Sequence, residues 1–182
     1  DLRIFTDAGL PAENATLLPN PIPLPSALSN DTCAASVNSP AILFAPVRGI
    51  RRKNLGELVL LSALAPANSW FATSRAPLSP DALPIHDHWQ KFASRQRLPI
   101  EFGVTDRLAP AAGTTSSFGS WVQHATHFVT TSVAEGFGLP FLEAIAHGKP
   151  LLGRNLAHLT AEHHQHGIRT GHLYDRLLIP VS

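Results

Sequence analysis

Cysteine is nearly absent from this sequence, because Cys33 is the only one among 182 residues. A single cysteine excludes an internal disulfide and favours a reducing compartment, so we expect a cytoplasmic protein. Charged residues make up only 15% of the chain, and the formal net charge is +1. This near-neutral balance gives no electrostatic basis for binding nucleic acid, so no nucleic-acid partner is expected.

Long apolar runs are also missing. The longest one, Leu58 to Ala65, is far shorter than the roughly 20 residues that a membrane-spanning helix needs. The chain does not open on a basic segment followed by an apolar stretch, as a secretion signal would. We therefore predict no transmembrane segment, and any membrane association of the full-length protein would be peripheral.

Residues 1–40 differ in composition from the rest of the chain. Four prolines alternate with other residues there and favour an extended segment: Pro19, Pro21, Pro23 and Pro25. Residues 30–40 are small and polar, which is typical of a loop. We predict that 1–40 is a linker at the edge of another domain, and the start at Asp1 without Met suggests a fragment.

From residue 41 onward, short apolar runs alternate with helical patterns. The expected strands are 41–46, 70–73, 99–104, 127–131 and 150–153, and the expected helices are 55–65, 86–98, 116–125, 140–147 and 157–166. Asn54 is the expected N-cap of the first helix, with Glu57 three residues later. This alternation predicts an α/β fold, a Rossmann-like parallel sheet with helices on both faces, as one domain over 41–182.

The loop after the fourth strand has the features of a phosphate site. Gly136 and Gly138 allow an unusual backbone path and close approach of a ligand. Pro140 suits the first helical position, which leaves the N–H groups of Phe141 and Leu142 free to point at the crevice. Such a helix N-terminus, at the carboxyl edge of a parallel sheet, favours a bound phosphate.

Charged residues surround this predicted site. Glu135 precedes the helix and Glu143 is expected in its first turn, and carboxylates accept hydrogen bonds from sugar hydroxyls. A basic cluster follows the first strand at the same edge of the sheet: Arg48, Arg51, Arg52 and Lys53. Such side chains can neutralise a diphosphate and stabilise it as a leaving group.

The segment Thr131 to Pro150 resembles the donor-site signature of GT-B fold retaining glycosyltransferases, of the family 4 or group 1 type. That signature has two glutamates separated by seven residues around Gly-Phe-Gly-Leu-Pro, and it ends in Gly-x-Pro; Glu135 and Glu143 have this spacing. Arg48 and Lys53 resemble the family's Arg-x4-Lys pair. The segment 102–104 is similar to the strand end whose following backbone meets the nucleobase, and the similarity extends over most of residues 15–165.

The resemblance implies a role for each of these residues. Glu143 would hold the ribose hydroxyls of a nucleoside diphosphate sugar, and Glu135 would contact the donor sugar. Arg48 and Lys53 would bind the diphosphate, and with Glu135 they form the expected catalytic set. The remaining donor-binding residues would be Gly136, Phe137, Gly138, Leu139 and Val104.

The resemblance also implies what the protein does without. The chain has no Asp-x-Asp motif, which agrees with a metal-independent family in which the basic pair replaces the cation, and no cofactor is expected. The N-terminal acceptor domain would be missing, so the isolated half would transfer nothing. Val47 stands where the family usually has glycine, and the loop 105–117 does not align.

Other interpretations remain open at this point. Glu143 can merely favour a helix N-terminus, Glu135 can be a solvated loop residue, and Arg48 and Lys53 can form a solvated basic turn. The histidines at 163–166 suggest a metal site, but neighbours on one helix do not converge, so a solvated helix end fits better. The rival functions are a dinucleotide oxidoreductase, a non-catalytic sugar-nucleotide-binding module, and a GT-B phosphorylase or epimerase. The dinucleotide-binding motif of an oxidoreductase is incomplete in this chain, because Phe141 stands where its third glycine would be.

Overall fold

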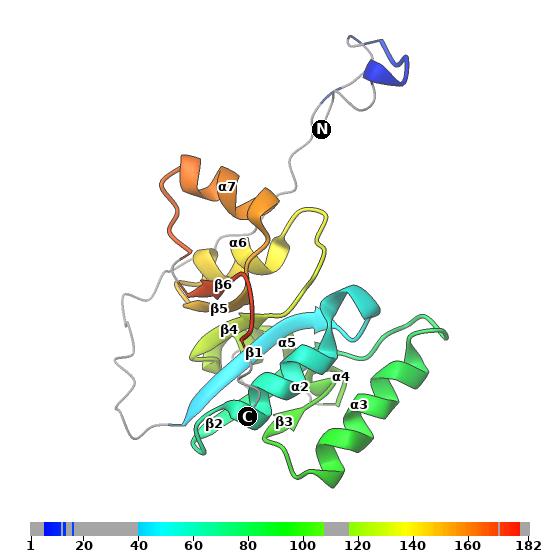
Figure 1. Ribbon diagram of the computed structural model, residues 1–182, viewed down its shortest axis with the longest axis vertical. Helices are drawn as coiled ribbons and strands as arrows, with labels where there is room; N and C mark the ends of the chain where they lie inside the picture. The colour runs from blue at the N-terminus through cyan, green and yellow to red at the C-terminus, as the bar shows by residue number, and fades with distance from the viewer. Residues whose placement is uncertain are drawn as a thin grey trace.

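The computed structural model describes residues 6–11, 13, 16, 40–107, 117–170 and 172–178. The predicted linker at 1–40 lies almost entirely outside these residues, as do Cys33 and much of the loop 105–117. Over the described part, the chain forms one parallel sheet in the order β3-β2-β1-β4-β5-β6 (Figure 1). The strands are β1 (Ala41–Arg48), β2 (Ser69–Arg75), β3 (Ile100–Glu101), β4 (His127–Thr130), β5 (Leu151–Arg154) and β6 (Leu173–Tyr174).

Helices connect consecutive strands. They are the short 3-10 helix η2 (Arg51–Lys53), α2 (Leu55–Leu64), α3 (Leu83–Arg95), α4 (Val104–Arg107), α5 (Ser117–His124), α6 (Leu139–Ala146) and α7 (Ala157–Gln165). The predicted strands and helices from residue 41 to 166 are therefore present, with ends displaced by up to three residues. The α/β fold class with a Rossmann-like parallel sheet is confirmed.

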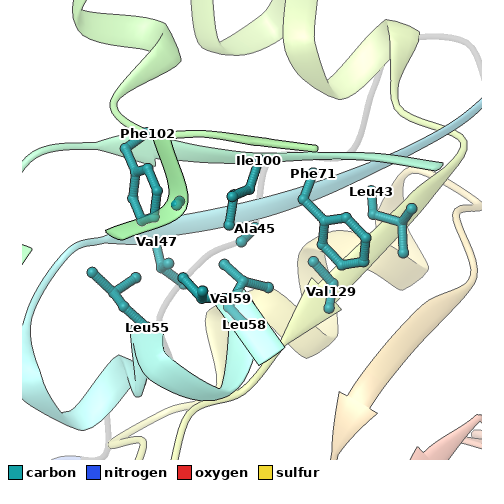
Figure 2. Close-up of a cluster of buried hydrophobic side chains, with 11 residues drawn as sticks. Leu43, Ala45, Val47, Leu55, Leu58, Val59, Phe71, Ile100, Phe102 and Val129 are labelled. Atoms are coloured by element: carbon teal, nitrogen blue, oxygen red, sulfur yellow. The ribbon is translucent and has the colours of Figure 1, made fainter. Parts of the chain in front are cut away.

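Alternate residues of each central strand face opposite sides of the sheet. In β1, Leu43, Ala45 and Val47 pack on one side against α2 and α3, and Phe44 packs on the other. Figure 2 shows the first of these cores, in which side chains of α2 meet those of the strands. The second core joins Phe44, which is fully buried, to β4, α5 and α6. Helices therefore cover both faces, because β1, β2, β4 and β5 each have apolar side chains for both cores.

The strand order reverses between β1 and β4. The chain runs outward from β1 through β2 to β3 and then returns to pair β4 on the other side of β1, where Phe44 lies opposite Phe128. The connection after β1 leads to α2 on one face, and the connection after β4 leads to α6 on the other. At such a point the two connections diverge and leave a crevice beyond the carboxyl ends of the strands.

The third strand is shorter than expected. A strand was predicted over 99–104, but β3 ends at Glu101 and α4 begins at Val104. Gly103 lies between them with φ +66°, a left-handed conformation that ends an extended strand. The prediction of a continuous strand over 99–104 was wrong, because the left-handed conformation of Gly103 interrupts the extended backbone.

The expected cap of α2 is also wrong in its detail. Asn54 stands at the N-cap position, but its φ is +50° and its side chain makes no capping hydrogen bond. Its amide instead donates to the carboxylate of Glu57, at 2.8 Å. In addition, β6 was not predicted, because two residues carry too little pattern to indicate a strand.

The helices were also compared with the length and hydropathy that a membrane span requires. Among residues placed by the structure, none of the helices is long and apolar enough to cross a bilayer.

Candidate functional site

The crevice between β1 and β4 is bordered by the η2 turn on one side and by the β4–α6 loop on the other. These two segments are joined directly. Thr131 donates its hydroxyl hydrogen to the carbonyl oxygen of Lys53, at 2.9 Å, and also lies 3.2 Å from that of Asn54. The N–H of Val133 donates to the carbonyl oxygen of Arg52, at 2.9 Å. The backbone of the basic turn is thus fixed to the loop that carries the glutamate motif.

Glu135 and Lys53 form an ion pair in this crevice. The ammonium of Lys53 donates to Oε1 of Glu135, and the side chains are only 9% and 5% exposed. Arg52 donates to the other carboxylate oxygen at 2.9 Å, and to the carbonyl oxygen of Ala134 at 3.2 Å. The interpretation of Glu135 as a solvated loop residue, and of Lys53 as part of a solvated turn, is therefore wrong.

Charge and burial act against each other on this pair. Burial tends to raise the pKa of Glu135, but the ammonium of Lys53, the nearby Ser132 hydroxyl and the guanidinium of Arg52 outweigh it and hold the pKa below its ordinary value. Burial lowers the pKa of Lys53, although the carboxylate of Glu135 acts in the opposite direction. The two cations therefore keep the carboxylate of Glu135 ionised, although it is partly desolvated.

Glu143 is the second carboxylate on which Lys53 acts electrostatically. The side chain is half-buried, and burial raises the pKa of its carboxyl group, with the positive charge of Lys53 partly opposing this. Glu143 was expected in the first turn of its helix, but α6 begins at Leu139, so Glu143 falls in the second turn. The ammonium of Lys53 therefore pairs with Glu135 and also acts electrostatically on the carboxyl group of Glu143.

The start of α6 differs from the prediction in its hydrogen bonds. The N–H groups of Phe141 and Leu142 were expected to be free, but both donate to the carbonyl oxygen of Gly138, at 2.9 and 3.4 Å. Within the described part of the chain, the N–H groups of Gly138 and Leu139 have no hydrogen-bond acceptor. The backbone donors available to a ligand are therefore those of Gly138 and Leu139, three residues before the pair of N–H groups expected to be free.

The glycines of the motif have different roles. Gly138 is the N-cap of α6 with φ +75°, and a Cβ there would lie 2.8 Å from Cδ1 of Leu159. The left-handed conformation favours glycine, whereas the contact involves the end of a flexible side chain that can shift. At Gly136 a Cβ would meet nothing within 4 Å. Phe137 and Leu139, also predicted to bind donor, have side chains 40% and 42% exposed and so remain accessible.

Two predicted residues are not brought into this cluster. Arg48 is the last residue of β1 and half-buried, and among the described residues it forms no ion pair with Glu135 or any other carboxylate. Val104 begins α4 with its side chain in the second core, so only its backbone can face a ligand. Both stay predictions as donor contacts.

Arg52 is the site residue that sequence reasoning did not select. It belonged to the basic cluster, but the spacing of the motif pointed to Arg48 and Lys53 alone. The structure places its guanidinium on Glu135 and on the rim of an open depression lined by Ile50, Arg51, Arg52, Asn54 and Val133. Three consecutive basic residues, Arg51 to Lys53, give no signal in the sequence that separates a side chain facing the loop from one facing solvent.

The histidines do not assemble into a metal site. Among the described residues, no group of three or more histidine, cysteine or acidic side chains is placed to hold a metal ion. The interpretation of 163–166 as a solvated helix end is wrong for His163, which is only 9% exposed, with its ring 6.2 Å from that of Phe141. Burial lowers the pKa of His163 and favours its neutral form.

Solved structures with the same fold are glycosyltransferases. HepE from Anabaena, solved in complex with UDP and glucose, has a TM-score of 0.57 and 18% identity and covers 87% of this chain. TarM from S. aureus, solved as a mutant with Fondaparinux, alpha-GlcNAc-glycerol and UDP, has a TM-score of 0.57 and 15% identity over 88% of this chain. The lipopolysaccharide outer core galactosyltransferase WaaB, in its apo form, has a TM-score of 0.50 and 16% identity over 82%. No protein-family model and no curated protein sequence matches the chain.

These similarities define the fold. The chain has the fold of the C-terminal domain of GT-B glycosyltransferases, as the resemblance of the glutamate motif implied. It spans 43% of the HepE chain, 29% of the TarM chain and 39% of the WaaB chain. The similarity therefore concerns one part of those larger proteins.

Proposed function

We propose that this chain is the donor-binding half of a retaining, metal-independent glycosyltransferase that takes a nucleoside diphosphate sugar. The observation that carries the proposal is the Lys53 ammonium at the topological switch point. It is paired with Glu135 and interacts electrostatically with Glu143. A parallel sheet binds ligands at this point of its edge. The spacing of the two glutamates around Gly-Phe-Gly-Leu-Pro supports the same assignment.

The diphosphate would be bound by cations and backbone donors. Lys53 and Arg52 supply positive charge, and the N–H groups of Gly138 and Leu139 stand at the positive end of the α6 dipole. Arg48 is the further cation expected from the motif. These groups would neutralise the charge that develops on the leaving diphosphate, which is the work that a metal ion does in other transferases.

The two carboxylates would accept hydrogen bonds from the donor. Glu143 would bind the ribose hydroxyls, since a half-buried carboxylate is a strong acceptor for paired hydroxyls. Glu135 already accepts from Lys53 and Arg52, but a carboxylate has about four acceptor positions, so it can also bind a sugar hydroxyl. In this role it would align the sugar relative to the diphosphate that the same two cations hold.

UDP-hexoses are the first donors to test. HepE was solved with UDP and glucose, and TarM was solved with UDP. The uracil would lie near the backbone that follows β3, from Gly103 to Val104. No acceptor is proposed, because acceptor contacts would come from a part of the GT-B fold that this chain does not span.

The test is a calorimetric titration of the purified chain with UDP-glucose, UDP-GlcNAc, GDP-mannose, ADP-glucose and NAD. We expect one sugar nucleotide to bind without added metal, and EDTA to leave the affinity unchanged. Lys53→Met and Arg52→Met should each weaken binding about 10-fold or more, since a charge-assisted hydrogen bond contributes about 1.5–3 kcal/mol. Lys91→Met and Arg95→Met on the exposed side of α3 are the matched controls and should bind as the wild type does.

Two results would contradict the proposal. Binding of NAD in preference to every sugar nucleotide, unaffected by Lys53→Met, would favour the dinucleotide oxidoreductase. If the α3 control variants weakened binding as much as the site variants do, the affinity would depend only on the net charge of the protein. Transfer is expected only when both substrate-binding halves are present, because the reaction needs both reactants held together, so the full-length protein is the material for the activity assay.

A further inference from the structure

A second polar cluster lies where α2 meets the ends of β5 and β6. Its centre is the carboxylate of Glu57, which is 9% exposed. Arg154 donates to it through Nε, at 3.1 Å, and through Nη2. Tyr174 donates its hydroxyl hydrogen at 2.6 Å, and Asn54 its amide hydrogen at 2.8 Å. We call these four residues the Glu57 cluster.

The cluster connects distant parts of the chain. Arg154 lies 97 positions from Glu57, and Tyr174 lies 117 positions from it. The guanidinium of Arg154 also lies over the ring of Tyr174, 5.8 Å from its centre. All four acceptor positions of the carboxylate are used, so the cluster has no vacancy for a ligand. A buried ion pair is poor evidence for stability alone, because apolar residues of similar volume would serve as well.

Asn54 links this cluster to the donor site. It follows Lys53 directly and adopts φ +50°, a left-handed conformation that asparagine accepts more readily than most residues other than glycine. Its side chain donates to Glu57 at 2.8 Å, and its carbonyl oxygen lies 3.2 Å from the hydroxyl of Thr131. The residue at the end of the basic turn therefore contacts both α2 and the loop that carries the glutamate motif.

We propose that the Glu57 cluster positions the basic turn, so that the last strand of the sheet sets where Lys53 and Arg52 meet the donor diphosphate. This inference rests on the proposed function. Glu57, Arg154 and Tyr174 act through Asn54 and touch no donor atom, so they are positioning residues. Displacement of a catalytic group by about 1 Å can cost about 100-fold, which is why such support matters.

The two charged or phenolic donors of the cluster keep their protons. Burial and the hydrogen bond to Glu57 raise the pKa of Tyr174, so its phenol stays a neutral donor. Hydrogen bonding to Glu57 raises the pKa of Arg154 further. Tyr174 and Arg154 therefore remain donors near neutral pH, as a fixed support requires.

The experiment compares Glu57→Gln and Tyr174→Phe with Asp175→Asn. The control residue, Asp175, accepts a hydrogen bond from Asn155 at 2.8 Å, so it joins the ends of β5 and β6 without touching α2. Two quantities are measured for each variant: the Kd of UDP by calorimetry, and amide hydrogen exchange by mass spectrometry in the peptide that covers 50–55. Tyr174→Phe keeps the ring and removes one hydroxyl, so it remains informative if Glu57→Gln does not fold.

We expect Glu57→Gln to weaken UDP binding about 10-fold and Tyr174→Phe about 3-fold, since interacting residues couple through a shared network. Exchange should rise in 50–55 but not in β2, and Asp175→Asn should match the wild type in both measurements. Wild-type exchange and affinity in both cluster variants would overturn the inference. So would exchange that rises equally in β2, because the role would then be general stability.

The failure of the proposed function is separable from the failure of this inference. If the wild-type chain does not bind UDP, the proposed donor class is wrong, whereas the exchange measurement still decides whether the cluster fixes the turn. Unchanged exchange in Glu57→Gln would then overturn the positioning role on its own. Raised exchange limited to 50–55 would support it.

Discussion

The ion pair between Lys53 and Glu135 gives the most direct test of the site geometry. In a double-mutant cycle, Lys53→Met and Glu135→Gln are made singly and together, and each replacement keeps nearly the same volume. The cycle isolates the coupling between the two side chains, because effects that each mutation has elsewhere cancel. Unfolding in urea, followed by circular dichroism, gives the four free energies of unfolding.

The structure sets the size of the coupling. Opposite charges about 4 Å apart attract by about 4 kcal/mol at an effective dielectric constant of about 20, whereas exposed pairs contribute about 0.2–1 kcal/mol. The side chains here are 9% and 5% exposed, which puts the pair toward the larger value. Arg52 remains 2.9 Å from the carboxylate when Lys53 is replaced and reduces the loss. We therefore expect a coupling of about 2 kcal/mol.

Acidification provides a second measurement on the same variants. The pKa of Glu135 is below its ordinary value of 4.5, so its ionised form stabilises the fold above that pH. This stabilisation is lost as the pH falls through the lower value in the folded state. The difference between wild type and Glu135→Gln should therefore shrink below about pH 4.5. A coupling under about 0.5 kcal/mol at pH 7, with no change on acidification, would refute the buried ion pair.

Three further substitutions test other parts of the site and the sheet. At neutral pH, Glu143→Gln should raise the free energy of unfolding slightly, because burial disfavours the charged carboxylate and solvent screening of this half-buried group reduces the effect. This gain should shrink as the pH falls toward 4.5, and titration should show weaker UDP-glucose binding; a variant that binds equally well removes the ribose role. Gly138→Ala should lose about 1–2 kcal/mol, visible as a lower Tm, because φ is +75° and the new Cβ lies 2.8 Å from Leu159; an unchanged Tm contradicts this. Gly153→Ala should not fold, as judged by circular dichroism, because its Cβ would lie 1.8 Å from the carbonyl oxygen of Thr130; a native spectrum would show that β4 and β5 are spaced differently.

Much of the fold could be predicted because its strands are buried on both faces. The run 41–46 is apolar throughout, and its alternate residues enter two different cores. The predicted ends of strands and helices were wrong where the backbone conformation of a single residue determines the end. Gly103 ends β3 early, and the start of α6 at Leu139 moves Glu143 into the second turn. Such conformations depend on tertiary contacts rather than on composition.

The candidate site was predictable in its residues and less so in its contacts. The spacing of Glu135 and Glu143 identified the loop, but nothing in it indicated that Glu135 is held by Lys53 and Arg52. That contact joins segments 82 and 83 positions apart, and only the pairing of β1 with β4 brings them together. The Glu57 cluster was invisible for the same reason, since its partners come from strands at the far edge of the sheet.

The pairing of β1 with β4 also determines when the site can exist during synthesis. The basic turn leaves the ribosome well before the carboxylate loop, because about 80 residues separate them. Contacts between such distant segments form late, after the intervening chain has closed its loop. A nascent chain that has completed α2 and α3 therefore carries the cations of the turn without the carboxylates that bind them. The proposed site in the crevice can form only when the centre of the sheet has assembled, so capture of a ligand there would report that folding of this domain is complete.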